Sequence, residues 1–351
     1  MGVAYISVQW NRQKKFYDAV LVGGVAVYLS LFGALTKSLF PFVTDEIMLM
    51  RAFGTAAFLL LHVILAIGPL SRLNPKFLPL LYNRRHAGVT LFLLALVHAT
   101  LVILTYHAGS NVNPIASIFI SSPLNGSVTG VPFQPFGFFA LVILFLLAAT
   151  SHDFWLANLS APVWKSLHML VYFAYALLVL HVTFGVLQGE THPLYVGATA
   201  AGLLGVVSLQ LVAARTTRPL DEEKAPNPSP DGFVDSCGLA DIPENRARIV
   251  CLSGERVAIF KYDGKISAVS NLCQHQNGPL GEGKIIYGCI TCPWHGYQYA
   301  PDTGAAPAPF VEKVPTFKVQ VRGGRVFVHP KPNPAGTQVE PALIAAPATI
   351  L

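Results

Sequence analysis

Long apolar segments alternate with short polar loops through the first 214 residues of the chain. A membrane-spanning helix needs about 20 predominantly apolar residues. Six segments approach or reach that length: 19–35, 52–70, 87–106, 136–150, 169–187 and 194–214. Lipid-facing backbone must satisfy its hydrogen bonds internally, which favours helices over an open sheet. The pattern predicts an all-α, six-helix membrane bundle over residues 18–215, preceded by an N-terminal segment, residues 1–17.

A different pattern begins near residue 216. Residues 216–231 are rich in proline and charged residues, which predicts an extended linker. From residue 232, short β-rich runs alternate with glycines and predict a small all-β domain over residues 232–330. The runs are 249–252, 257–260, 317–321 and 326–328. The Pro- and Ala-rich residues 331–351 predict a disordered tail.

Composition agrees with a membrane location. The chain is 53% hydrophobic and 12% charged, whereas soluble domains are about 25% charged. The net charge of +6 does not indicate nucleic-acid binding, because the basic residues lie at the ends of apolar segments. The basic residues are concentrated in the N-terminal segment, in the loops after the second span and before the fifth, and after the sixth span. The positive-inside rule then predicts that both termini and the β domain are cytoplasmic.

All the cysteines lie in the C-terminal third of the chain: Cys237, Cys251, Cys273, Cys289 and Cys292. Their number is odd, and their spacing suggests metal ligation rather than a disulfide framework. Reduced cysteines in turn indicate a reducing compartment for this domain.

The strongest motif lies within residues 271–304. It contains Cys273-x-His275 and, after sixteen residues, Cys292-x-x-His295. A Rieske [2Fe–2S] centre needs two thiolates on one iron and two imidazoles on the other. Two short loops that each supply one Cys and one His meet that requirement. A structural zinc site is the alternative, because Cys₂His₂ also suits tetrahedral zinc.

The segment NLCQHQNGPLGEGKIIYGCITCPWHGYQYAPDTG closely resembles the Rieske family, over about residues 232–330. The resemblance implies that the four motif residues hold a [2Fe–2S] cluster. Respiratory members add a disulfide between the loops, where this chain has Gly278 and Trp294, and a serine where it has Tyr297. Fewer hydrogen bonds to the cluster should lower its potential. The chain thus resembles the ferredoxin and oxygenase type, and Cys289 is interpreted as a strand residue.

The third and fifth predicted helices each carry two histidines: His86, at the cytoplasmic start, and His98 on the third, and His168 and His181 on the fifth. Ionisable residues in spans indicate function by default. At 1.5 Å per residue the pairs are separated by about 18 Å and about 19.5 Å. The two helices run in the same direction, so the inner and the outer histidines can pair and hold two b-type haems.

The surrounding segments, such as NRRHAGVTLFLLALVH, resemble the ferric-reductase-like transmembrane family. They are especially similar to the haem-binding membrane subunit of bacterial methionine sulfoxide reductase, which implies a bacterial inner membrane. The resemblance implies haem b, one or two copies, with His98, His181 and His168 as ligands. His86 is the candidate fourth ligand, although it lies closer along the helix to His98 than the corresponding histidine does in two-haem members of the family.

Other readings of the histidines stay open at this point. His86 is alternatively an interfacial anchor beside two arginines, and His62 is either a rival ligand or a hydrogen-bonded core residue. His107 and His192 are expected to be exposed loop residues.

The combined prediction is a membrane all-α six-helix bundle followed by a small all-β Rieske domain. No flavin or nicotinamide motif is found, so a separate cytoplasmic reductase or ferredoxin is the expected electron donor. Electrons would pass between the cluster and the haems, and on to a quinone or an extracytoplasmic redox protein. The chain would act as an oxidoreductase or electron-transfer subunit. The alternatives are a quinol-oxidising cytochrome b–Rieske fusion and a membrane-bound Rieske oxygenase.

Overall fold

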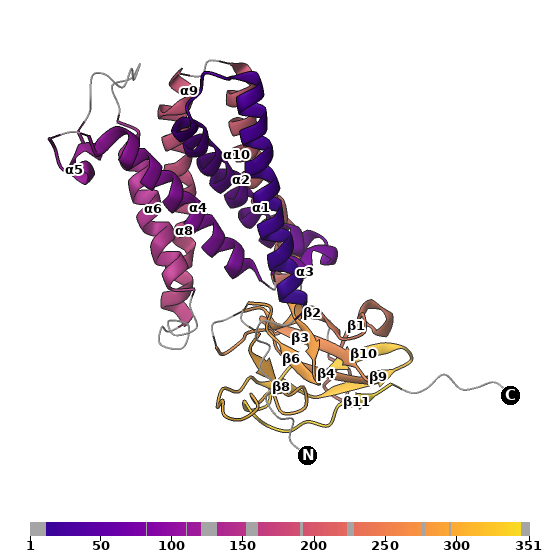
Figure 1. Ribbon diagram of the computed structural model, residues 1–351. Helices are drawn as coiled ribbons and strands as arrows, with labels where there is room; N and C mark the ends of the chain where they lie inside the picture. The colour runs from indigo at the N-terminus through magenta and orange to yellow at the C-terminus, as the bar shows by residue number, and fades with distance from the viewer. Residues whose placement is uncertain are drawn as a thin grey trace. The chain divides into compact units, whose positions relative to one another are not determined.

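The computed structural model describes residues 12–81, 83–109, 111–120, 132–151, 161–189, 192–222, 228–275, 278–294 and 296–344. The chain forms two compact units (Figure 1). One consists of helices and comprises Arg12–Leu70 and Asn83–Val212. The other contains all the described strands.

The helical unit is built from long helices joined by short ones. The long helices are α1 (Arg12–Leu39), α2 (Asp45–Leu73), α4 (Arg84–Val102), α6 (Gln134–Ala149), α8 (Ala161–Phe184) and α10 (Pro193–Glu222). The short ones are α5 (Pro114–Ile118) and α9 (Val186–Gly189), whereas the short helix α3 (Leu78–Leu81) belongs to the other unit. A π-helical segment, Ile103–His107, continues α4.

Five of the helices are long and apolar enough to cross a membrane: Lys14–Leu39, Asp45–Leu73, Arg84–His107, Ser166–Gly189 and Pro193–Thr216. They coincide with five of the six predicted spans. The remaining one, α6, is apolar but only 16 residues long. At 1.5 Å per residue it measures about 24 Å, which is shorter than a typical hydrocarbon core. The sixth span therefore stays a prediction.

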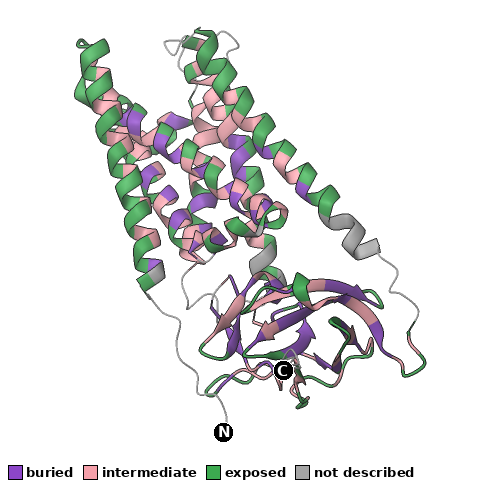
Figure 2. Cartoon of the chain, turned by 90° about the vertical axis from the view of Figure 1, so that its right-hand side faces the viewer, coloured by how far each residue is buried: buried purple, intermediate pink, exposed green. Residues whose placement is uncertain are grey.

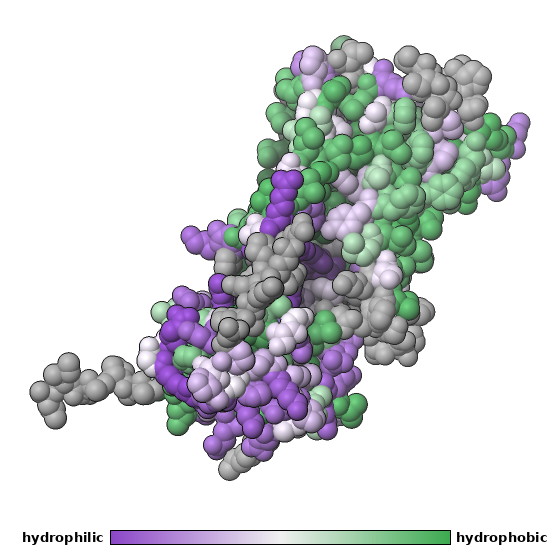
Figure 3. Space-filling model, turned by 180° about the vertical axis from the view of Figure 1, so that it is seen from behind, coloured by the Kyte–Doolittle hydropathy of each residue, from purple (hydrophilic) through white to green (hydrophobic). Residues whose placement is uncertain are grey.

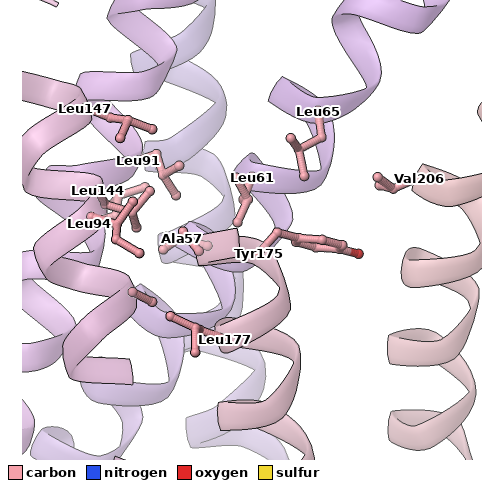
Figure 4. Packing of buried hydrophobic residues seen from close by; sticks show 14 residues of the cluster. Ala57, Leu61, Leu65, Leu91, Leu94, Leu144, Leu147, Tyr175, Leu177 and Val206 are labelled. Atoms are coloured by element: carbon pink, nitrogen blue, oxygen red, sulfur yellow. The ribbon is translucent and has the colours of Figure 1, made fainter. Parts of the chain in front are cut away.

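The core of the helical unit lies between α2, α4, α6 and α8. Buried side chains from all four helices meet there, among them Leu61, Leu94, Leu144 and Leu177 (Figure 4). Buried positions on these helices face inward and exposed ones face outward (Figure 2). Many of the exposed side chains on these helices are large and apolar, and the face of the helical unit seen in Figure 3 is mostly hydrophobic, as expected for helices that contact lipid.

Helix boundaries differ from the hydropathy boundaries at both ends of the bundle. Helix α1 begins at Arg12, inside the predicted N-terminal segment, and α10 continues to Glu222, inside the predicted linker. A hydropathy pattern marks where lipid-compatible side chains end. Backbone hydrogen bonding continues beyond that point, because polar residues outside the bilayer also form helix.

The β unit consists of short antiparallel strands. They are β1 (Val234–Gly238), β2 (Arg246–Leu252), β3 (Glu255–Tyr262), β4 (Lys265–Ser270), β5 (Lys284–Ile286), β6 (Cys289–Thr291), β7 (Gln298–Tyr299), β8 (Thr316–Phe317), β9 (Val319–Arg322), β10 (Arg325–Val328) and β11 (Ala342–Leu343). The sheet orders are β1-β10-β9, β11-β4-β3-β2 with β8 also on β4, and β5-β6-β7. Every predicted β-rich run lies in strands, although the run 317–321 is shared by β8 and β9.

The tail differs from its prediction. Residues 331–344 are ordered against the β unit, and β11 pairs with β4 in the register Ala342 to Ile266. The backbone amide of Val339 donates to the carbonyl of Asp302 over 2.7 Å. Composition misled here because strand addition uses backbone groups, which even a segment rich in Pro and Ala supplies. Residues 345–351 lie outside the described residues.

Candidate functional sites

Two loops of the β unit carry the two cysteines that are predicted to hold a cluster. Cys273 follows β4 and Cys292 follows β6, and each side chain is buried to 1% exposure. The amide of Cys273 donates to the carbonyl of Gly278 (2.9 Å), and the amide of Cys292 to that of Tyr297 (2.8 Å). Each loop is thus closed on itself by a backbone hydrogen bond that begins at a cysteine.

The first loop is also held by the hydroxyl of Tyr299, on β7. This oxygen accepts hydrogen bonds from the amides of Gln274 (3.0 Å) and His275 (3.3 Å). It lies 3.4 Å from Sγ of Cys273. Burial, and then the neighbouring Cys273 thiol, raises the pKa of Tyr299. Tyr299 therefore stays a neutral phenol whose O–H is available to the sulfur.

A second tyrosine supports the His275 ring. Tyr297 stacks on that imidazole, with 4.6 Å between ring centroids and an interplanar angle of 6°. Its hydroxyl donates to the Glu312 carboxylate. Burial alone would raise the pKa of Glu312, but the hydrogen bonds from Tyr297 and from backbone amides lower it overall. The carboxylate is thus ionised and holds Tyr297 in place.

The described residues fit a cluster bound between the two loops. All five cysteines are buried, and a Cβ at Gly278 would lie 2.7 Å from Sγ of Cys292. Only glycine leaves room beside that sulfur. Cys289 is a strand residue of β6, as interpreted from the sequence, and burial raises its pKa to about 11. The fourth predicted ligand, His295, lies outside the described residues.

In the helical unit, the rings of His98 and His181 face each other. Their centroids are 6.4 Å apart and their planes are nearly perpendicular, at 83°. An imidazole–metal bond measures about 2 Å and the ring centre lies about 1 Å behind the nitrogen, so two imidazoles on one metal have centres about 6 Å apart. The spacing of this pair fits bis-imidazole ligation of one iron.

Backbone carbonyls fix the orientation of both rings. Nδ1 of His98 lies 2.9 Å from the carbonyl oxygen of Met50, and Nδ1 of His181 lies 3.0 Å from that of Phe133. A carbonyl can only accept, so each Nδ1 carries the proton and each Nε2 keeps its lone pair. Metal-binding histidines characteristically have this arrangement.

Two other predicted histidines lie elsewhere. Nδ1 of His86 lies 2.8 Å from the Asp18 carboxylate of α1, and the described residues show no ring contact between His86 and His168. His168 is half-buried on α8. His62 has both nitrogens bonded, to the carbonyl of Phe58 (2.7 Å) and the hydroxyl of Tyr175 (3.0 Å), which agrees with the core reading rather than the ligand reading.

One expectation about the outer histidines is wrong. His107 is buried to 7% exposure, and its Nδ1 lies 2.6 Å from Oγ of Ser117. The π-helical turn carries His107 onward from α4, and α5 folds back over it. The hydropathy pattern predicted that the span ends near His107, but it did not indicate that α5 covers this residue. His192 is exposed, as expected.

Comparison with known proteins agrees with both halves of the chain. The long apolar helices and the ligand loops define an integral membrane protein with a redox-metal domain. Residues 49–179 match the ferric reductase like transmembrane component, and residues 232–318 match the Rieske [2Fe-2S] domain. The chain is therefore a fusion of these two domains, and its β unit belongs to the Rieske family.

Three of the similar proteins each cover between a quarter and a third of this chain. The ferredoxin component of the naphthalene 1,2-dioxygenase system of Pseudomonas aeruginosa is 31% identical over 27% of this chain and 93% of its own length. Cholesterol 7-desaturase nvd of Xenopus laevis is 32% identical over 28% of this chain and only 24% of its own. The carbazole 1,9a-dioxygenase ferredoxin structure from Nocardioides aromaticivorans IC177 is 27% identical, with a TM-score of 0.27, over 28% of this chain and 98% of its own.

Proposed function

We propose that this chain is a membrane electron-transfer protein. It passes electrons between a cytoplasmic Rieske cluster and b-type haem within a six-helix bundle, and on to a quinone or an extracytoplasmic redox protein. A cytoplasmic reductase or ferredoxin is the partner at the cluster. The observation that carries the proposal is the facing pair of His98 and His181 in a chain that also contains a Rieske domain.

The cofactors supply one-electron chemistry when bound, and the residues bind and orient them. Cys273 and Cys292 would ligate one iron as thiolates, and His275 and His295 the other as neutral imidazoles. Tyr299 holds the first loop closed and directs its hydroxyl to Cys273. Within the helices His98 and His181 would hold one haem, with His168 and His86 as candidates for a second site.

The proposal is tested with purified full-length protein, reduced anaerobically, by optical and EPR spectroscopy with iron and haem quantified. We expect a Rieske EPR signal together with b-haem bands. His98→Ala and His181→Ala should each lose the bands of one haem and keep the Rieske signal.

The matched control is His62→Gln. His62 also lies inside the bundle, but both its nitrogens are engaged by protein groups, so this variant should keep the full haem spectrum. A full haem spectrum in both ligand variants would contradict the assignment. A cluster without haem in the wild type would leave a membrane-anchored Rieske carrier.

A further inference from the structure

The haem-ligand pair lies in a repeated structure within the helical unit. The hairpin of α2 and α4 recurs as the hairpin of α6 and α8, 83 positions later. The same 48 positions separate each histidine from the carbonyl that accepts its Nδ1 proton. The equivalent residues at the site are Met50 and Phe133, Gly54 and Gly137, and His98 and His181.

Packing supports the equivalence of the two hairpins. At the same offset, residues that are buried in the first hairpin correspond to residues that are buried in the second. These pairs are Ala57 and Ala140, Leu61 and Leu144, Leu91 and Ala174, and Leu94 and Leu177. All eight belong to one core cluster, several of them visible in Figure 4. The bundle thus places two copies of one hairpin around a shared core.

The glycines occupy the point of closest approach to the histidines. A Cβ at Gly54 would lie 2.8 Å from Nδ1 of His98, and a Cβ at Gly137 would lie 2.8 Å from Nδ1 of His181. Each glycine follows its acceptor carbonyl by four residues. In an α-helix the carbonyl of residue i points toward residue i+4, so a ring that bonds to that carbonyl must pass over this position. Any side chain there would push the imidazole away from the carbonyl.

We propose that Gly54 and Gly137 are equivalent positioning residues for the two axial histidines. Each glycine, together with the carbonyl of Met50 or Phe133 four residues before it, makes one of two equivalent positioning sites. Each site fixes the tautomer and ring orientation of one histidine. This inference rests on the proposed haem ligation by His98 and His181.

The chain offers two matched controls. A Cβ at Gly202, on α10, would lie 2.6 Å from Nε2 of His62, so Gly202→Ala introduces a similar clash against a membrane histidine that is not a proposed ligand. Gly88, on the same helix as His98, has nothing within 4 Å of an added Cβ, so Gly88→Ala reports the effect of the methyl group alone.

The experiment compares Gly54→Ala, Gly137→Ala, Gly202→Ala and Gly88→Ala in the full-length protein. The readouts are haem affinity, the low-spin haem EPR signal, the haem midpoint potential and the Rieske EPR signal as an internal standard. Loss of groups that orient a metal ligand typically costs roughly 10–100-fold in metal affinity. We expect a loss of that order, with a changed haem EPR signal, in Gly54→Ala and Gly137→Ala alike.

Gly202→Ala and Gly88→Ala should keep the wild-type haem EPR signal and potential, even if Gly202→Ala lowers stability. Wild-type haem signals in Gly54→Ala and Gly137→Ala would overturn the inference while leaving the proposed function intact. An effect in only one of them would overturn the equivalence, and the same spectral change in Gly202→Ala would reduce the role to packing. A wild-type protein without haem would instead remove the proposed function itself, and this inference with it.

Discussion

The two units of this protein hold their proposed metal-ligand residues in different ways. In the β unit the proposed ligands that the structure describes lie in two short loops, and the side chains of Tyr299 and Tyr297 add support to loops that backbone hydrogen bonds close. In the helical unit the facing histidines are 83 positions apart, and backbone carbonyls hold them. The first site can therefore be recognised from a sequence motif, whereas the second becomes apparent only from how the helices pack.

The environment explains the difference in supporting groups. A helix carbonyl already accepts one hydrogen bond but retains a second lone pair, so it can satisfy an imidazole N–H without burying another polar side chain among apolar ones. Burying an unpaired polar group is costly. In the β unit, by contrast, buried tyrosine hydroxyls are themselves paired, that of Tyr299 with loop amides and that of Tyr297 with Glu312. Glycine serves both sites, at Gly278 beside a sulfur and at Gly54 and Gly137 beside imidazoles.

Removing a proposed thiolate ligand should give the largest difference between the two units. Cys292→Ser should abolish the Rieske EPR signal, because an alcohol does not replace a buried thiolate on iron, and should keep the haem bands. Cys289→Ser is the matched control: Cys289 is equally buried on the adjoining strand, and this variant should keep the cluster. The measurement is EPR with iron quantified. Loss of haem bands along with the cluster would show that the two sites are not independent.

A smaller effect is expected from the tyrosine that holds the first loop. Tyr299→Phe removes a hydroxyl 3.4 Å from Sγ of Cys273. A hydrogen bond to a charged group contributes on the order of 1.5 kcal/mol, which for one electron corresponds to about 60 mV. We expect the cluster to remain and its midpoint potential to fall by that order.

Redox titration followed by EPR measures the shift. Tyr262→Phe is the control, because Tyr262 belongs to the same core cluster but bonds to Ser267 instead. An unchanged potential in Tyr299→Phe would show that the hydroxyl supports only the loop backbone.

The sequence predicted the two-domain order, five of the spans and the positions of the β-strands, because hydropathy and alternation are local properties. It also indicated His98 and His181. It did not indicate Tyr299 or Glu312, since their roles depend on strand pairing and loop closure. The equivalence of Gly54 and Gly137 was detectable in principle, because glycine and histidine recur at the same offset in the sequence. The recurrence can be interpreted only once the structure shows that the carbonyls of Met50 and Phe133 accept from the histidines.

The ordered tail gives the prediction with the smallest effect on redox signals. Truncation after Pro330 removes the strand pairing of β11 with β4 and the hydrogen bond from the Ile344 amide to the carbonyl of Gly264 (2.9 Å). The lost hydrogen bonds, at about 1 kcal/mol each, should lower the Tm of the β unit by roughly 5–15 °C. The tail contains no ligand, so the Rieske EPR signal and potential should persist below the transition. Truncation after Ile344 keeps those contacts and should leave the Tm unchanged. Equal Tm values for both truncations would mean that the edge of β4 does not need this cover, and stability would then come from the two core clusters alone.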